Sequence, residues 1–282
     1  MKSANSMKLS IICLAYNHEK YIEKAINGFL SQKTDFDFEI IIHDDKSQDS
    51  TQEIIKYYQA KFPEKIKAIL QKNNQRSIGG NVYKIALDAS CGKYIAYCEG
   101  DDYWVDDRKI QKQVEFLENN SNYSLTYSDC DIVNENDEFV KTFSPSKRDY
   151  SELELINGVS INTLTACYRR PEKIPEELGF SEYGDIFIWS LLGWQGKGKY
   201  LTTIKNSKYR IHSGGVHSKS TVGRKFDMIA ISYSMIIKYY HRMGRHEVVI
   251  NYRNKLIYEA IKFVIKSINL RRFFPRKSRI LE

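Results

Sequence analysis

The sequence predicts an α/β fold in which a mostly parallel sheet is flanked by helices on both faces. Over residues 1–130, short apolar runs rich in β-branched residues alternate with segments of helical periodicity. Apolar residues make up 42% and charged residues 28% of the 282-residue chain, which is typical of globular domains. No internal repeat interrupts this order, so the pattern indicates a layered α/β domain followed by a helical extension.

The first half contains four expected strands with a helix between each pair. The strands are Leu9–Ala15, Phe38–His43, Ile66–Leu70 and Tyr94–Cys98. Helices are expected after Asn17 as an N-cap, after Ser50 and Glu53 as a capping box, near Asn81–Ala89 and at about Arg108–Glu118. This alternation predicts parallel pairing, and ligands of such sheets bind at the carboxyl ends of the strands.

The second half has weaker strand patterns and ends in helices. Strands are expected at about Ser124–Val133, Thr163–Arg169 and Tyr200–Ile204, with a polar connection at Asn134–Glu154 and a helix near Asp185–Leu192. Residues 226–269 have the periodicity of two helices. We therefore divide the chain into a domain over residues 1–225 and a basic helical extension over residues 226–282.

The formal charge of +8 is concentrated near the C-terminus. Residues 266–279 contain no acid and six basic residues: Lys266, Arg271, Arg272, Arg276, Lys277 and Arg279. Apolar residues lie beside them: Phe263, Val264, Ile268, Phe273 and Phe274. Two interpretations follow, a solvated helix face or peripheral contact with anionic lipid headgroups. No recognition motif supports nucleic-acid binding, so no nucleic-acid partner is expected.

The five cysteines form no CxxC pair, and three of them (Cys13, Cys98 and Cys167) lie inside apolar runs. This arrangement predicts small buried thiols in a reducing compartment, and hence a cytoplasmic protein. No run reaches the ~18–20 apolar residues that span a bilayer.

Acidic residues follow two of the expected strands at their carboxyl ends. Asp44 and Asp45 come after the second strand, and the run Glu99-Gly100-Asp101-Asp102 comes after the fourth. Carboxylates gathered at one sheet edge repel each other unless a cation or hydrogen-bond donors balance them. A hard divalent cation that takes its other ligands from phosphate suits Asp101 and Asp102. Turn formation and helix capping are the structural alternatives for all of these acids.

Three segments, taken together, resemble the family 2 inverting glycosyltransferases with the GT-A fold. They are SIICLAYNHEKYIEKAINGFLSQ, FEIIIHDDKSQDST and GKYIAYCEGDDYW. The later segments YSLTYSDCDIV, NTLTACYRR, SEYGDIFIWSLL and KYRIHSGGVHS continue the resemblance, which covers roughly residues 8–218. It implies a nucleotide-sugar-binding half at about residues 8–115 and an acceptor half at 116–225. One departure is Glu99, which stands where the family's usual DxDD pattern begins.

The resemblance also implies roles for individual residues on the donor side. Tyr16 is expected to stack on or flank the nucleotide base, and Asp45 to accept a hydrogen bond from it, most naturally from uracil N3–H. Arg76 is expected to contact the base or a phosphate. Asp101 is expected near the ribose and the metal.

Metal and acceptor roles follow in the same way. Asp102 is expected to ligate Mn²⁺ or Mg²⁺ on the diphosphate. For His212 two interpretations stay open, a contact with the metal or the diphosphate, or an ordinary surface or packing histidine. Asp185 is expected to be the general base that takes the proton of the acceptor hydroxyl. Direct displacement at the anomeric carbon needs no covalent nucleophile, so the lack of a Ser-His-Asp pattern is consistent with it.

The function implied is transfer of a sugar from a UDP-sugar to a hydroxyl of a saccharide or lipid-linked saccharide in cell-surface glycan synthesis. We expect this to occur in the cytoplasm, at the inner face of the membrane. A Mg²⁺-dependent nucleotidyltransferase is one alternative, but it would show a Gly-rich phosphate loop where this chain has Ala15-Tyr16-Asn17. A non-catalytic nucleotide- or glycan-binding module is another, and it would not need Asp45, Asp101, Asp102 and Asp185 together.

Overall fold

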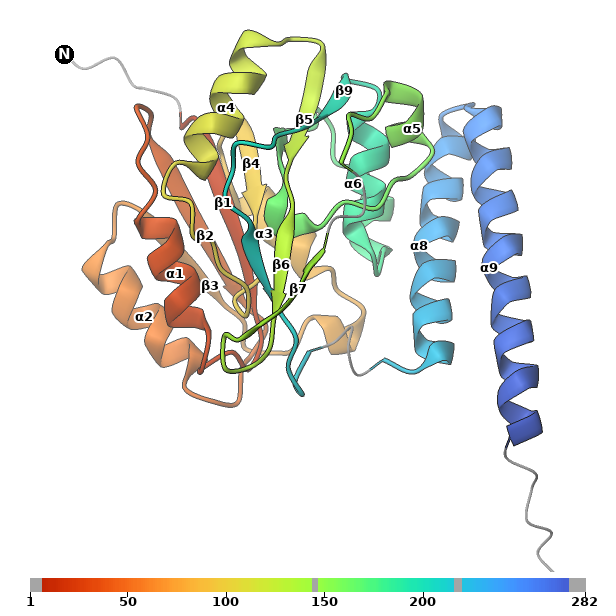
Figure 1. Ribbon diagram of the computed structural model, residues 1–282, viewed down its shortest axis with the longest axis horizontal. Coiled ribbons are helices and arrows are strands. Elements are labelled where there is room, and N and C mark those ends of the chain that lie inside the picture. The colour runs from red at the N-terminus through yellow and green to blue at the C-terminus, as the bar shows by residue number, and fades with distance from the viewer. Residues whose placement is uncertain (1–6, 144–146, 216–219, 274–282) are drawn as a thin grey trace, which may run out of the picture.

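A seven-stranded sheet with strand order β3-β2-β1-β4-β8-β5-β9 forms the centre of the computed structural model (Figure 1). The structure describes residues 7–143, 147–215 and 220–273, with side chains described through residue 267. The strands are β1 Leu9–Ala15, β2 Phe38–Asp44, β3 Ile66–Leu70, β4 Tyr94–Tyr97, β5 Tyr123–Tyr127, β8 Cys167–Arg169 and β9 Lys197–Tyr200. All neighbours pair in parallel except β8, which is antiparallel to both β4 and β5. The predicted mostly parallel sheet is therefore confirmed.

Helices cover both faces of this sheet and enclose two separate cores. One core lies under α1 (Ile22–Leu30), α2 (Thr51–Lys61) and α4 (Lys109–Asn119), and the other under α3 (Val82–Ala89) and α6 (Gly184–Leu192). Side chains alternate between them along β1, where Ile11 and Cys13 enter the first core and Ile12 enters the second. Burial on both faces explains why β1 is an unbroken apolar run.

A smaller three-stranded sheet, β10-β6-β7, lies beside the main one. It contains β6 (Cys130–Val133), β7 (Phe139–Phe143) and β10 (Ser207–Arg210). The single strand predicted at Ser124–Val133 is thus two strands, β5 and β6, in different sheets. The predicted polar connection also contains β7 and the short helix α5 (Glu152–Ile156). The sequence pattern does not predict β7, because all of its residues are exposed and it has no alternation of buried and exposed positions.

The predicted strand at Tyr200–Ile204 is misplaced, because β9 ends at Tyr200. The sequence of β9, Lys-Gly-Lys-Tyr, has no apolar run that would have predicted an edge strand.

One predicted helix cap is wrong, and a second, Ser50, is the N-cap residue of α2 but lacks the predicted capping box. Tyr21, not Asn17, is the N-cap of α1, and Asn17 adopts φ 57° while its Oδ1 accepts a hydrogen bond from Gln48 N at 2.7 Å. Ser50 makes no side-chain capping bond at the start of α2, so the predicted capping box is absent. Asp49 fills that role by accepting a bond from Thr51 N at 3.0 Å. Local polar side chains tie the β1 and β2 loops together instead of capping the expected helices.

The chain ends in two long antiparallel helices, α8 (Val222–Arg242) and α9 (His246–Phe273), as predicted for residues 226–269. The boundary predicted at residue 225 falls inside α8, which packs against α6. The rings of Phe226 on α8 and Phe263 on α9 stack at 4.8 Å, so Phe263 faces its neighbour and not a membrane. Phe273 and Phe274 lie outside the residues whose side chains are described, as does Ile268. None of the helices in the described ranges combines the length and apolar character needed to cross a bilayer.

Four cysteines, among them the three expected in strands, are buried and free, and Cys91 is exposed and free.

Candidate active site

The candidate site lies at the carboxyl ends of β1, β2 and β4, where an α/β sheet binds its ligands. The small sheet adds a fourth element there, because an antiparallel bridge joins Tyr103 to Lys208 of β10. This contact brings the segment after β10 alongside the acidic run that follows β4. Asp101 and His212, which are 111 positions apart in the sequence, therefore meet.

The donor side of the site is built by Tyr16 and Asp45. Tyr16 follows β1 and is 43% exposed, so its ring is available to a ligand. Asp45 is buried, and its two oxygens accept bonds from Gln75 N at 2.6 Å and Arg76 N at 3.1 Å. Asp45 thereby anchors the loop after β3, and each oxygen keeps one further lone pair for a ligand.

Asp44 has a structural role. It is fully buried, and its carboxylate accepts bonds from Ser47 N and Gln52 Nε2.

Asp101 sits between two histidines. His212 Nε2 lies 2.9 Å from Asp101 Oδ2, and His18 Nε2 lies 3.6 Å from the same oxygen. One ligand atom from each of the three residues falls within 4.8 Å of the other two. His18 was missed by sequence reasoning, although its place just after the first strand was a usable signal.

Gly100 and Arg210 hold this group in place. A Cβ at Gly100 would lie 2.7 Å from Ile22 Cδ1 and 3.0 Å from His18 Nδ1, so a larger residue would force the Ile22 and His18 side chains to shift. Arg210 donates from Nε to the Asp101 carbonyl oxygen at 2.9 Å and from its backbone N to Asp102 Oδ1 at 2.7 Å.

Asp102 therefore lies outside the group of three and is buried against the backbone of β10.

Burial and neighbouring charges separate the protonation behaviour of these acids. Burial would raise the pKa of Asp101, but the charge of His18 and the hydrogen bond from His212 outweigh it, and the net pKa is lowered. Burial, together with the charges of Asp101 and Glu99, raises the pKa of Asp102 well above its usual range. Asp101 is thus the carboxylate that stays ionised at this edge.

The group of three fits a divalent cation. Burial lowers the pKa of His18, although the charge of Asp101 opposes this shift. The lowered pKa keeps the imidazole ring neutral at pH 7, and the neutral ring is the form that binds metals. Adjacent ligands on a metal with bonds of about 2.1 Å lie about 3 Å apart. The separations here are 2.9 and 3.6 Å. Two imidazoles and one carboxylate are a donor set suited to a transition metal more than to Mg²⁺.

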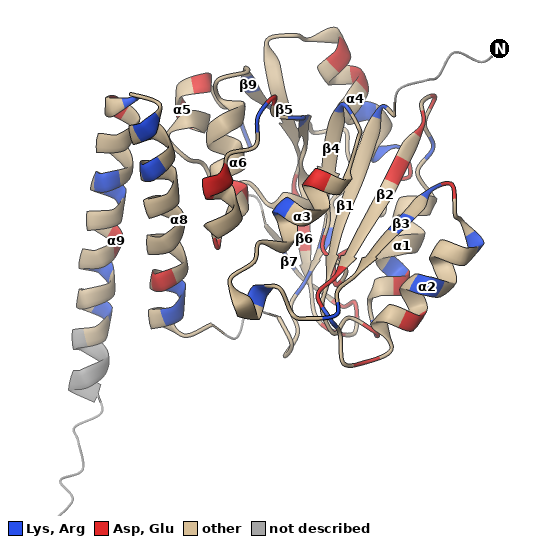
Figure 2. Cartoon of the chain, turned by 180° about the vertical axis from the view of Figure 1, so that it is seen from behind, with Lys and Arg blue, Asp and Glu red and all other residues tan. Residues whose placement is uncertain are grey.

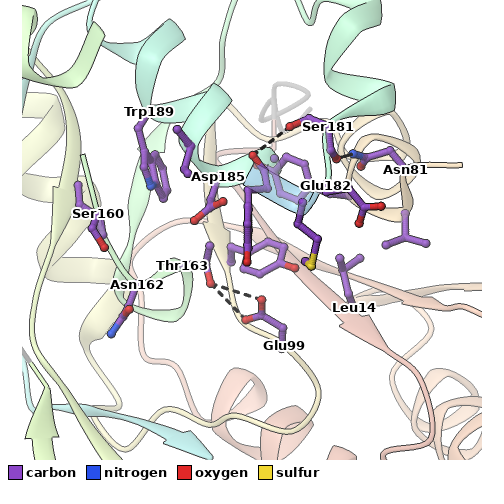
Figure 3. A pocket seen from close by; sticks show the side chains of 18 of the residues that line it. Leu14, Asn81, Glu99, Ser160, Asn162, Thr163, Ser181, Glu182, Asp185 and Trp189 are labelled. Carbon is purple, nitrogen blue, oxygen red and sulfur yellow. Dashed lines mark hydrogen bonds between the residues drawn. The ribbon is translucent and has the colours of Figure 1, made fainter. Parts of the chain in front are cut away.

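A pocket of about 840 Å³ adjoins this edge, within the size range of small-molecule sites. Asp185, at the start of α6, and Glu99 point into it, with Thr163 between them in the view of Figure 3. Thr163 Oγ1 lies 3.3 Å from Glu99 Oε2. Met228, Ile229 and Tyr233 of α8 complete the wall of the pocket, a contribution that sequence periodicity did not distinguish from ordinary helix packing.

Two of the carboxyl groups that line the pocket, those of Asp185 and Glu99, hold protons more tightly than usual. Burial raises the pKa of Asp185 to about 6, although backbone N–H groups at the start of α6 favour the ionised form. Burial and the charge of Asp101 raise the pKa of Glu99 to about 8. At neutral pH Asp185 is therefore mostly ionised but a much better proton acceptor than an exposed aspartate.

Arg76 also lines the pocket, where its guanidinium lies 3.5 Å from Glu182. Arg224 lies 2.9 Å from the other oxygen of Glu182. The structure thus places Arg76 and Asp185 in the pocket wall, and Tyr16, Asp45 and Asp101 at the adjoining sheet edge. The backbone of Arg76 links the two parts, because it bonds to Asp45.

Residues 10–172 match the model of glycosyl transferase family 2. The chain belongs to this family. The match spans β1 to β8, so it includes Tyr16, Asp45, Asp101 and Asp102, while Asp185 and His212 follow it. Family membership favours the glycosyltransferase interpretation over the nucleotidyltransferase alternative.

Two similar proteins extend the comparison. The uncharacterized protein Rv1520 of Mycobacterium tuberculosis is 34% identical over 230 residues, which are 77% of this chain and 63% of that protein. This chain therefore spans less than two thirds of the mycobacterial relatives. The Escherichia coli enzyme WfaP, a UDP-Glc:alpha-D-GlcNAc-diphosphoundecaprenol beta-1,3-glucosyltransferase, is 29% identical over 92% of this chain and 94% of its own.

A solved structure shows the same fold. TarS of Staphylococcus aureus, residues 1–349 in complex with UDP-GlcNAc, has a TM-score of 0.61 and 20% identity over 82% of this chain and 67% of those 349 residues. The GT-A-like architecture is therefore confirmed.

Proposed function

We propose that this protein is an inverting glycosyltransferase that moves a sugar from a UDP-sugar to a hydroxyl of a lipid-linked saccharide in cell-surface glycan synthesis. The observation that carries the proposal is the placement of Asp185. Its carboxyl group enters a pocket that adjoins the sheet edge bearing Tyr16, Asp45 and Asp101. The Asp185 carboxylate, which can accept a proton, thus lies beside the sheet edge that we propose binds the nucleotide. The pocket leaves room there for the acceptor saccharide.

In the reaction, the acceptor hydroxyl attacks the anomeric carbon of the donor sugar, and the bond from that carbon to the UDP phosphate oxygen breaks. Asp185 takes the proton of the hydroxyl, and its pKa of about 6 suits this role near neutral pH. The attack comes from the side opposite to UDP, so the configuration at the anomeric carbon inverts. WfaP, by its name, makes a β linkage from UDP-Glc, an α-linked donor, which is the same outcome.

Tyr16 and Asp45 would hold the nucleoside. The exposed ring of Tyr16 offers a face for the base, and Asp45 has lone pairs left for uracil N3–H. Thymine offers the same N3–H group, so the preference for UDP rests on similar proteins whose names give UDP-Glc as the donor. Arg76, whose side chain lines the pocket, is proposed to contact the base or a phosphate.

Asp101, His212 and His18 would hold the divalent cation, with Mn²⁺ favoured over Mg²⁺ by the two imidazoles. When bound, the cation neutralises charge that develops on the diphosphate leaving group. The role of Asp102 as a metal ligand remains a prediction from the resemblance, and its Oδ1 bonds to Arg210 N.

A transfer assay tests the proposal. Purified protein is incubated with Mn²⁺, a panel of UDP-, GDP- and dTDP-sugars, and a synthetic lipid diphosphate that carries GlcNAc, the acceptor type in the name of WfaP. Release of UDP with formation of a longer glycolipid, both abolished by EDTA, is the expected result. Binding of UDP without any turnover on this or other saccharide acceptors would favour the non-catalytic module. Failure to bind any nucleotide would refute the proposal.

A further inference from the structure

Helix α9 exposes an apolar stripe that nothing in the described chain covers. Ile250, Ile257, Ile261, Val264 and Ile265 are each between 52% and 58% exposed. Their spacing places them on one face of the helix over more than four turns, and we call this face the α9 ridge. Single exposed aliphatic residues are ordinary, whereas a continuous stripe is typical of an interaction surface.

The ridge is not a by-product of how α9 packs. The opposite face already supplies the contacts that attach α9 to the domain, since Val248, Val249 and Tyr252 are buried and Phe263 stacks on Phe226. Polar residues on the ridge face would leave these contacts unchanged. The aliphatic residues therefore serve something other than the core.

Basic residues accompany the ridge. Between residues 248 and 281 the only acid in the sequence is Glu259, against these Lys and Arg residues: Arg253, Lys255, Lys262, Lys266, Arg271, Arg272, Arg276, Lys277 and Arg279. Arg253 is exposed and lies between Ile250 and Ile257 at helical spacing. Figure 2 shows basic residues along both α8 and α9.

Two of these basic side chains have partners within the chain. Lys255 donates to the Gly158 carbonyl oxygen at 3.1 Å, and Lys262 pairs with Glu259 at 2.8 Å. The charge beside the ridge therefore comes from Arg253 and from the sequence between residues 263 and 281, which has basic residues and no acid. An apolar face in so basic a segment is complementary to an anionic lipid surface.

We propose that the α9 ridge lies against an anionic membrane surface, with α9 in the plane of the headgroups. A second copy of this chain is the other occupant of comparable shape. Pairing two ridges would place an exposed Arg253 from each copy at an interface between two chains of net charge +8, and like charges oppose such contact. Charge therefore favours an anionic lipid surface over a second copy of this chain as the occupant of the ridge.

The position of the ridge deepens the proposed function, on which this part of the inference rests. α8 lies between α9 and the pocket, packing against α9 and lining the pocket with Met228, Ile229 and Tyr233. In Figure 1 the first turn of α8 and the described end of α9 lie at the end of the molecule that holds the carboxyl ends of β1 and β2. A membrane on the ridge is thus separated from the pocket by two helices, α9 and α8, and an acceptor anchored in lipid would reach the pocket past the ends of these helices.

Vesicle flotation of the full chain tests the inference. Phosphatidylcholine vesicles are compared with vesicles that also contain phosphatidylglycerol. The protein is expected to float with the anionic vesicles, at least about tenfold more tightly than with neutral ones, and to be released by salt. The double variant Ile257→Ser, Ile261→Ser is expected to lower the partition coefficient at least about tenfold.

A matched control is Tyr57→Ser, which removes an exposed aromatic side chain on α2, away from α9. It is expected to leave flotation unchanged. UDP binding, measured by calorimetry, should be the same in both variants, so a failure here is separable from failure of the proposed function. Equal flotation of the wild type and the ridge variant would overturn the inference. So would a dimer in light scattering that the ridge variant converts to monomer without any vesicle binding.

Discussion

Replacing Asp185 by Asn is expected to abolish transfer while stabilising the protein. Folding raises the pKa of this carboxyl group from 3.8 to about 6, because burial disfavours its charge. A shift of that size lowers the free energy of unfolding of the wild type by at most about 3 kcal/mol at high pH. Asp185 is partly exposed where it lines the pocket, so we expect a gain of about 1–3 kcal/mol in the free energy of unfolding for Asp185→Asn at pH 8.

The sign of the pH dependence follows from the same pKa values. Between pH 3.8 and about 6 the unfolded chain has released this proton while the folded chain still holds it, so the wild type loses stability over that window. Above it the loss is complete and constant. The advantage of Asp185→Asn should therefore be larger at pH 8 than at pH 5.

Two assays check this prediction. Urea unfolding at pH 5 and pH 8 measures the stability difference, and initial rates of transfer measure the loss of the base, expected to be about 10²–10⁴-fold in kcat. The wild-type rate should rise with pH, with an acid limb near the pKa of about 6. A variant that is less stable than wild type at pH 8, or that retains most of its activity, would refute the assignment of Asp185 as a desolvated general base.

Two further predictions concern the donor side. His18→Ala and Asp101→Asn should each weaken Mn²⁺ binding at least about tenfold in an electron paramagnetic resonance titration. The exposed control His241→Ala should not, and a loss with Asp102→Asn as large as with Asp101→Asn would instead make Asp102 a ligand. Tyr16→Ala should raise the Kd of UDP about 5- to 100-fold by removing a stacking face, and an unchanged Kd in calorimetry would show that the base lies elsewhere.

Apolar periodicity was sufficient to predict the centre of the fold. β1 to β4 are buried on one or both faces, so their sequences are short apolar runs, and the two final helices repeat at helical spacing. The same signal fails for β7 and β9, whose residues are exposed or polar. It also fails at the junction of β5 and β6, where one segment of mixed apolar and polar residues serves two sheets.

The site was predictable in its parts but not in its contacts. Asp45 and Asp101 were found because acidic residues gather after two apolar strands, and Asp185 because its segment resembles the catalytic segment of the family. The meeting of His18 with His212 depends on the bridge between Tyr103 and Lys208, a tertiary contact that no local pattern encodes. The separation of Asp101 from Asp102 likewise arises from Arg210, far along the chain.

The anomeric configuration of the product tests the central claim most directly. The product formed from a UDP-α-sugar and a lipid-linked saccharide would be isolated, and its new linkage assigned by proton NMR. The account predicts a β linkage, formed in one displacement with Asp185 as the base. An α linkage, or a covalent glycosyl-enzyme trapped during turnover, would contradict it.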